Sequence, residues 1–388
     1  MLAGAKTTCF ILLLGAGALV SGSSPLPTEV ERVLHASWRS YCRQHIQADG
    51  RVSLGAQERE TGSETQAGVL LRAVAAGDAA TFARVYVWTR INLSRRERQG
   101  DALLARRWGL KDDGVGVILE DNTDAGADLD YALALALAAR RGWKPPASQP
   151  DYGAEARQVA RDILRQEVAT LSSGEHLLLP GTDAPRQPPY LIKPSDFSPA
   201  AFRLLSRLEP DPRWQSLHRA TYSLLQRLSL KLGGMPGMGF FPDWCRLEAD
   251  GRFLPQPGKS KHFNGAARQL PVRVALDRLW FGEQQAADLL GVFLVPLRPE
   301  WRGRGKLMAA YSYDGQPLAA YESPVLYAGV LAAALAAGDR DLAGQMAAKI
   351  MTFYHEEGEQ AYFGTPTDDQ ANHWAWVALA LYGNLLKP

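Results

Sequence analysis

Apolar residues recur at helical spacing along almost the whole chain, and this periodicity limits the fold more than any other feature. Near the N-terminus, four of them lie four positions apart: Leu34, Trp38, Cys42 and Ile46. The segment 129–140 is rich in Ala and Leu on every side, which is typical of a helix that is buried all round. Segments with a period of two are short, and those at 115–119 and 177–179 predict only minor hairpins. The chain is therefore predicted to be all-α.

Further helical patterns follow one another to the C-terminus. They cover residues 153–171, 198–208, 213–232, 267–278, 283–296, 323–337, 339–354 and 370–386. Together with the earlier patterns they predict about twelve helices in consecutive pairs, separated by turns that contain Gly, Asp or Pro. The chain has no repeat of fixed period and no Ser/Gly linker, so a solenoid is disfavoured and residues 24–388 are predicted to form a single domain. The Pro-rich stretch 180–199 is predicted to be a long surface loop.

Residues 1–23 have the layout of a secretory signal peptide. One lysine precedes the apolar run 9–20, and small residues follow at 21–24. This order is typical of a cleaved signal, and the apolar run is short for a membrane span. An uncleaved membrane anchor is the less favoured interpretation. We therefore expect an exported protein, either secreted or periplasmic.

Removal of this segment would leave two cysteines, Cys42 and Cys245. An oxidising compartment would allow them to pair. Both lie in apolar patterns that are helical or nearly so, which favours two separately buried thiols.

Several kinds of chemistry have no support in the sequence. Lys and Arg number 43 against 41 Asp and Glu, for a net charge of +2, which is too balanced for an electrostatic nucleic-acid binder. The chain has no P-loop, no dinucleotide-binding glycine motif, no C-x-x-C and no histidine pair at ligand spacing, so neither a metal nor a cofactor is expected. Carboxylates and ten tryptophans remain. These suit carbohydrate chemistry, in which carboxyl groups transfer protons and flat rings stack on sugars.

Three segments, in order, resemble glycoside hydrolase family 8. The first includes residues 50–52, 63–66, 88–89 and 92–93. The second is DAGADLDYALALALAARRGW at 124–143, and the third combines GFFPDW at 239–244 with GAARQLPVRVALDRLWFG at 265–282. Residues 177–181 and 193–195 also match in order. Within the family, the chain resembles the periplasmic endo-β-1,4-glucanases of bacterial cellulose-synthase operons.

The resemblance implies an (α/α)6 barrel with an open groove for a β-1,4-linked glucan. It also implies hydrolysis with inversion, in which an acid protonates the glycosidic oxygen and a carboxylate about 6.5–9.5 Å away activates water. We accordingly expect an exported endo-β-1,4-glucanase linked to cellulose or exopolysaccharide production. It would be a monomer without a cofactor, and the polysaccharide-synthase machinery is its candidate partner.

Glu64 matches the general acid of the family. Residues 61–64 also have the T-x-x-E pattern of a capping box, in which Glu64 would instead accept a backbone hydrogen bond at a helix start. The residues alone favour the cap, whereas the family register favours the acid.

Four further residues are implied to bind substrate: Trp108, Asp128, Trp244 and Arg273. Each has a structural alternative. Asp128 would also suit the positive end of a helix dipole. Arg273 would either clamp a carboxylate, face the groove or bury its stem beside apolar neighbours. The two tryptophans would otherwise belong to the core.

The chain departs from the family pattern at positions expected in the groove. The first signature aspartate is Gly126, and the catalytic base, counted back from Pro271, is Ala266. Loss of a general base costs about 10²–10⁴-fold in rate. Four more groove positions also differ: Thr65, Gly68, Arg106 and Gln269.

Two explanations of these departures remain open. In the first, Asp124 or Asp277 substitutes as the base and the protein is an active hydrolase. In the second, hydrolysis is impaired, and the protein binds glucan as an accessory of polysaccharide synthesis or export. A third interpretation, an unrelated helical toroid such as a polysaccharide lyase, has only Tyr362 and His373 in its favour.

Overall fold

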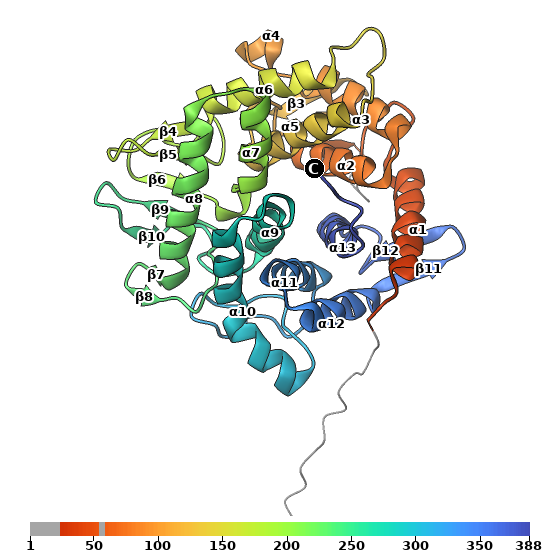
Figure 1. Ribbon diagram of the computed structural model, residues 1–388. Helices are drawn as coiled ribbons and strands as arrows, with labels where there is room; N and C mark the ends of the chain where they lie inside the picture. The colour runs from red at the N-terminus through yellow and green to blue at the C-terminus, as the bar shows by residue number, and fades with distance from the viewer. Residues whose placement is uncertain (1–23, 54–58) are drawn as a thin grey trace, which may run out of the picture.

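The computed structural model describes residues 24–53 and 59–388, and its helices form a closed double ring (Figure 1). The inner ring consists of α2 (Ser63–Ala76), α5 (Ala125–Arg140), α7 (Pro199–Leu208), α9 (Leu270–Phe281), α11 (Pro324–Ala337) and α13 (Asp369–Tyr382). The outer ring consists of α1 (Pro27–His45), α3 (Ala79–Asn92), α6 (Tyr152–Gln166), α8 (Pro212–Leu230), α10 (Gln284–Arg304) and α12 (Arg340–Met351). The short α4 (Arg96–Gln99) and the 3-10 helices η1 (Pro194–Asp196) and η2 (Gly265–Gln269) lie in connections.

Each inner helix contacts its two inner neighbours, and the contact between α13 and α2 closes the ring. The outer helix that follows each inner helix in the chain packs against its outer side. The exception is α13, the last inner helix, which packs against α1 at the start of the chain. The (α/α)6 barrel that the sequence predicts is thereby confirmed.

The position of a helix in the ring explains its composition. Residues 125–138 of α5 are all buried, and α11 is buried along most of its length, because an inner helix has neighbours on every side. The outer helix α6 has buried residues along one face only. Apolar side chains on all sides therefore predict an inner helix, and an apolar stripe predicts an outer one.

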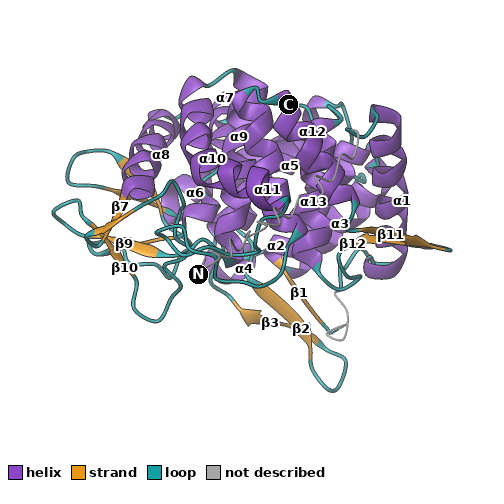
Figure 2. Ribbon diagram, turned by 90° about the horizontal axis from the view of Figure 1, so that it is seen from below, coloured by secondary structure: helices purple, strands orange, loops and turns teal. Residues whose placement is uncertain are grey.

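Short strands lie in the long connections that lead into the inner helices. They are β1 (Glu60–Gly62), β2 (Arg107–Leu110), β3 (Gly116–Glu120), β4 (Val168–Thr170), β5 (His176–Leu178), β6 (Tyr190–Ile192), β7 (Lys231–Leu232), β8 (Met235–Pro236), β9 (Cys245–Leu247), β10 (Phe253–Pro255), β11 (Tyr354–Glu357) and β12 (Gln360–Phe363). They form the antiparallel sheets β1-β2-β3 and β10-β9-β6 and three hairpins. Figure 2 shows β1–β3, β7, β9 and β10 at one end of the helix ring. The N-termini of the inner helices point to this end.

Several predicted segments differ from the structure. The helix predicted at 153–171 ends as α6 at Gln166, and residues 168–170 form β4; the helix predicted at 370–386 ends as α13 at Tyr382. The helix predicted at 339–354 corresponds to α12, which ends at Met351. Tyr354, the last residue of the predicted segment, is the first residue of β11. The helix predicted to end at 296 continues as α10 through two prolines to Arg304, because packing against α8 and α11 outweighs the local cost of proline. The stretch 180–199 is only partly a surface loop, since it contains β6 and the buried η1.

The predicted signal peptide, residues 1–23, lies outside the described residues. Cys42 and Cys245 are separate free thiols, as the sequence predicts, and burial raises the pKa of the Cys42 thiol to about 12. Among the helices of the described ranges, none has both the length and the apolar character that a membrane span needs.

Candidate active site

The inner helices bring polar side chains together at one end of the ring. Glu64 lies in the first turn of α2, Asp124 caps α5, and Asp196 ends η1 shortly before α7. Gln269 precedes α9, and Gln370 lies in the first turn of α13. The positive ends of helix dipoles favour carboxylates at such positions. These five residues come from five separate segments, so only closure of the ring assembles them.

Glu64 is exposed and accepts hydrogen bonds from two side chains. Gln370 Nε2 lies 3.2 Å and Gln269 Nε2 lies 3.5 Å from Glu64 Oε1. The N-cap of α2 is Gly62, which provides no side-chain cap, and Thr61 belongs to β1. The predicted capping box is therefore wrong, because Glu64 bonds to residues of other helices instead of the backbone of its own. Its carboxylate remains accessible to a ligand.

A small polar cavity beside Glu64 has a volume of about 10 Å³, room for about one water molecule. Its lining includes Arg72, Asp130, Arg273, Asp369 and His373. The four charged groups form two ion pairs, Arg72 with Asp369 at 3.9 Å and Arg273 with Asp130 at 2.5 Å. His373 is neutral, because burial lowers its pKa well below the usual value. The groups beneath the acid thus neutralise one another.

Arg273 clamps Asp130 across the ring, from α9 to α5. Its Nη1 lies 2.5 Å from Oδ1 and its Nη2 lies 2.7 Å from Oδ2, and both residues are buried. The guanidinium also lies 5.3 Å from the ring centre of Trp374. Burial disfavours its charge, but Asp130 raises the pKa of Arg273 above the usual value. Of the roles that the sequence leaves open, the structure therefore favours the carboxylate clamp.

Lys193 joins two buried carboxylates beside Gly126. Its Nζ lies 3.0 Å from Asp124 Oδ2 and 2.8 Å from Asp196 Oδ1. Burial opposes ionisation of Asp124, but Lys193 and the Ala127 N–H hold its pKa below the usual value. Burial raises the pKa of Asp196 to about 7 despite the ammonium beside it. Burial also disfavours the charge of Lys193, but its two carboxylate partners and Glu64 raise its pKa. Because η1 packs against η2, whose Gln269 bonds to Glu64, this cluster belongs to the same site as Glu64.

Ala266 lies in η2, and the Asp243 carboxylate contacts this turn. Asp243 Oδ1 accepts a hydrogen bond of 2.9 Å from the Ala267 N–H. A Cβ at Gly265 would lie 2.8 Å from Oδ2, so the Asp243 side chain packs tightly against the turn. Burial raises the pKa of Asp243. Asp243 thus caps the turn that carries Ala266.

The two predicted groove tryptophans differ in exposure. Trp244 is partly exposed, and the Nζ atoms of Lys193 and Lys259 lie 5.9 and 4.9 Å from its ring centre. Trp108 is only 7% exposed; it packs edge-on against Trp88, and Arg51 lies over its ring. Trp244 therefore has surface to offer a sugar beside the Lys193 cluster, whereas Trp108 has little.

Asp128 does not reach the groove. It is fully buried and accepts a hydrogen bond of 2.9 Å from the Leu104 N–H. Burial raises its pKa well above the usual value, and the nearby Glu167 raises it further. The predicted contact of Asp128 with substrate is therefore corrected to a structural role, because its carboxylate holds the segment before β2 against α5.

Asp277 lies near the C-terminal end of α9, away from the acid at the N-terminal end of the ring. It is fully buried, and its Oδ2 lies 2.7 Å from both His218 Nε2 and the Tyr222 hydroxyl. Arg203 bonds to His218 and pairs with both Asp277 and Glu283. The Arg203 guanidinium therefore supplies the positive charge that balances Asp277 and Glu283. The structure does not bring Asp277 to Glu64, so its prediction as a substitute base is corrected.

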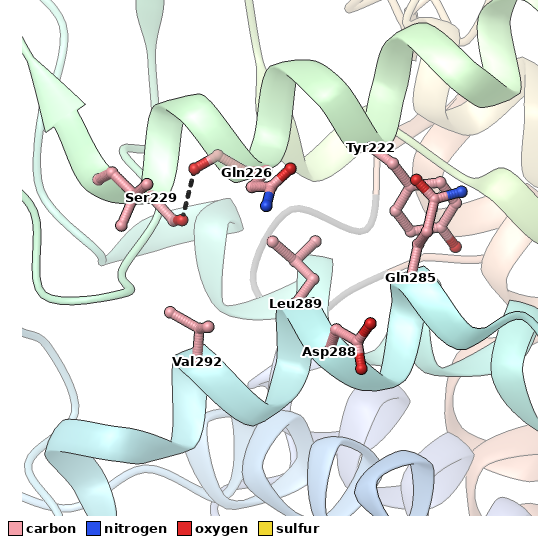
Figure 3. A pocket seen from close by; sticks show the side chains of 8 residues that line it. Tyr222, Gln226, Ser229, Gln285, Asp288, Leu289 and Val292 are labelled. Carbon is pink, nitrogen blue, oxygen red and sulfur yellow. Dashed lines mark hydrogen bonds between the residues drawn. The ribbon is translucent and has the colours of Figure 1, made fainter.

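A cavity of about 160 Å³ lies between the outer helices α8 and α10 (Figure 3). Tyr222 and Gln226 face it from α8, and Gln285, Leu289 and Val292 face it from α10. None of these residues belongs to the cluster around Glu64. This cavity is therefore separate from the candidate site.

Sequence reasoning missed four residues of the site: Lys193, Asp196, Asp369 and Gln370. The first of these belongs to the matched segment 193–195, which ends one residue before Asp196. The stretch was interpreted as a surface loop because of its prolines, although Asp196 is only 3% exposed. Asp369 and Gln370 begin α13 without any motif that would mark them. Their contacts with α2 depend on ring closure.

The fold and the site define an (α/α)6-barrel protein with carboxylates gathered at the N-terminal end of its inner helices. The family model described as Glycosyl hydrolases family 8 matches residues 21–364, and the chain belongs to this family. This membership replaces the alternative of an unrelated polysaccharide lyase.

Curated relatives and solved structures agree with this assignment. Endoglucanase A of Acetivibrio thermocellus is 26% identical over 329 residues, which cover 82% of this chain and 64% of that protein. The endoglucanase of Escherichia coli (strain K12) is 29% identical over 216 residues, 55% of each chain. The chain thus spans about half the length of several curated relatives that it matches.

Two solved structures share the fold. The endo-beta-1,4-glucanase CMCax from Acetobacter xylinum has a TM-score of 0.68 and 19% identity, covering 92% of this chain and 99% of that one. The Beta-1,3-1,4-glucanase from Paenibacillus sp. X4 has a TM-score of 0.76 and 17% identity, covering 94% and 96%. At these identities the likeness concerns the fold alone.

Proposed function

We propose that the protein hydrolyses β-1,4-linked glucan, with Glu64 as the general acid. The observation that carries this proposal is the position of Glu64. The chain belongs to glycosyl hydrolase family 8, and Glu64 has an exposed carboxylate in the first turn of an inner helix, at the end of the ring where the inner helices begin. The relatives named endoglucanases support glucan as the substrate.

In this reaction Glu64 donates a proton to the glycosidic oxygen, and water attacks the anomeric carbon from the opposite face. The base that activates this water would lie about 6.5–9.5 Å from the acid. Asp124 remains the candidate from the sequence, and it is at the correct end of the ring. Its two carboxylate oxygens accept one bond each, from Lys193 and the Ala127 N–H, and each oxygen can accept one more from water.

The first test measures reducing ends released from soluble β-1,4-glucan by the wild type and by Glu64→Gln. Loss of the proton donor should lower the rate at least about 100-fold. Glu175→Gln, an exposed change in the turn between β4 and β5, is the matched control and should keep the wild-type rate. Equal rates for the wild type and Glu64→Gln would remove Glu64 from the mechanism.

A second candidate function, binding of glucan without cleavage, is favoured by Ala266. A methyl group stands where the family has its base, so the groove would hold a chain that it cannot hydrolyse. Calorimetry with cello-oligosaccharides should then show binding while product analysis stays blank. Absence of both would exclude this function.

Ala266→Asp distinguishes the two candidates further. If the groove is otherwise intact, this carboxylate should raise hydrolysis at least about tenfold. If the wild type is active and Ala266→Asp does not raise its hydrolysis rate, another residue serves as the base.

We also propose that the protein is exported as a monomer and serves cellulose or exopolysaccharide production. The layout of residues 1–23 supports export, and the similarity to endoglucanases supports the link to glucan. Cell fractionation with N-terminal sequencing of the mature chain tests export, and light scattering tests the monomer. Co-purification with the polysaccharide-synthase machinery tests the partnership. A protein found in the cytoplasm whose N-terminal sequence still begins at residue 1 would refute export.

A further inference from the structure

The carboxylate of Asp196 occupies space that Gly126 leaves open. A Cβ at Gly126 would lie 2.8 Å from Asp196 Oδ1 and 3.2 Å from Asp124 Oδ1. A Cβ does not approach an oxygen this closely in a folded protein. A side chain at 126 would therefore force the carboxylate of Asp196 to leave its present position beside Lys193. An acidic group is present at this point of α5, but it comes from η1.

One oxygen of this carboxylate lacks a partner. Asp196 Oδ1 pairs with Lys193 at 2.8 Å and lies 3.4 Å from the Ser195 hydroxyl. Asp196 Oδ2 accepts no hydrogen bond, although the residue is only 3% exposed. A buried acceptor without a donor costs free energy. Such a cost is tolerated where a ligand supplies the missing donor.

The surroundings of Asp196 indicate the kind of ligand. Lys193 links Asp196 to Asp124, and its ammonium also lies 5.9 Å from the ring centre of Trp244. The turn η1 packs against η2, and Gln269 of η2 bonds to Glu64, so the cluster lies next to the candidate acid. An acceptor, an ammonium donor and a partly exposed aromatic ring beside a proton donor suit a neutral sugar, whose hydroxyls donate and accept while its face stacks.

We propose that Asp196, oriented by Lys193, accepts a hydrogen bond from a hydroxyl of the glucan unit bound next to Glu64. Asp196 performs from η1 a task that a side chain at position 126 would perform from α5. This inference rests on the proposed glucan-binding function. It does not depend on whether the bound chain is cleaved.

The test measures binding of cellopentaose by calorimetry in the full chain carrying Glu64→Gln, which prevents turnover from disturbing the measurement. At pH 8, above the pKa of about 7 that burial gives Asp196, adding Asp196→Ala should weaken binding about 10- to 100-fold, as loss of a hydrogen bond to a charged group does. Adding Asp162→Ala instead is the matched control. Asp162 is equally buried at 3% exposed but lies on α6, so its loss should change the affinity less than about twofold.

A reciprocal exchange separates ligand contact from a merely structural role. With Asp196→Ala the space beside α5 is empty, so adding Gly126→Asp returns a carboxylate to it. The exchanged form should recover at least about tenfold of the lost affinity. If Asp196 only neutralises Lys193 within the fold, melting temperatures would change while affinity would not. That result would overturn the inference.

The remaining outcomes are also decisive. If Asp196→Ala does not fold, Asp196→Leu replaces it, because leucine keeps the approximate size but offers no acceptor oxygen; unchanged affinity in that variant overturns the inference. If the Glu64→Gln parent binds and adding Asp196→Ala leaves its affinity unchanged, the inference is overturned while the proposed function stands. Absence of any binding by the parent overturns the proposed function and the inference with it.

Discussion

Replacement of Arg273 by methionine should destabilise the barrel strongly. The change keeps a stem of similar length but removes the guanidinium that holds Asp130 through bonds of 2.5 and 2.7 Å. Arg273 is 4% and Asp130 is 5% exposed, so bulk water cannot replace the lost partner, and the small cavity beside the pair has room for about one water molecule. Breaking a buried ion pair by removing one side costs about 3–5 kcal/mol. We expect Arg273→Met to lower the free energy of unfolding by this amount at pH 8.

The cost should depend on pH. Burial already raises the pKa of Asp130, and Arg273 is the main group that opposes this shift. Without Arg273 the carboxyl should take up a proton at a higher pH, which removes the buried charge. The variant should therefore lose less stability at pH 5 than at pH 8.

Urea denaturation followed by circular dichroism measures both values. Arg32→Met is the matched control, because Arg32 pairs with Glu356 at 2.7 Å on the surface, where such a pair contributes roughly 0–1 kcal/mol. Combining Arg273→Met with Asp130→Asn should restore much of the loss, since no unpaired charge remains. A loss below about 1 kcal/mol at pH 8, or equal losses at both pH values, would refute the buried clamp.

Two further predictions concern buried carboxylates of the same end of the ring. Burial raises the pKa of Glu167 to about 8 from an ordinary 4.5, so between these values the folded protein keeps a proton that the unfolded chain releases, and stability falls as pH rises. The melting temperature of Glu167→Gln should therefore fall less between pH 5 and 8 than that of the wild type. If it falls as steeply with pH as the melting temperature of the control Glu175→Gln, the prediction is contradicted. Gly126→Asp alone should lower the melting temperature by several degrees, because its Cβ would lie 2.8 Å from Asp196 Oδ1; an unchanged melting temperature in differential scanning calorimetry would show that the two side chains fit together.

Local patterns in the sequence predicted most of the barrel. The Ala- and Leu-rich segment 129–140 predicts a helix buried on every side, and it is the inner helix α5. The predicted segments 198–208 and 323–337 agree with α7 and α11 to within one residue at each end. Helix ends were less predictable where packing outweighs local preference, as in α10, which continues past Pro296 and Pro299.

The candidate site was predictable only in part. The motif around Glu64 indicated an acid, and the structure leaves this carboxylate exposed at the mouth of the ring. The role of Arg273 stayed open between groove and clamp, because its partner Asp130 is 143 positions away in the chain. Asp196 could not be found from its own segment, since prolines around it are typical of a surface loop.

The sequence by itself determined the helices, their pairing and the family, because periodicity and motifs are properties of neighbouring residues. Only the tertiary structure decided which charges meet: Arg273 with Asp130, Lys193 with Asp124 and Asp196, and the glutamines with Glu64. These contacts join inner helices to one another and to the 3-10 helices η1 and η2 that precede α7 and α9. Their energies depend on burial that exists only once the ring is closed.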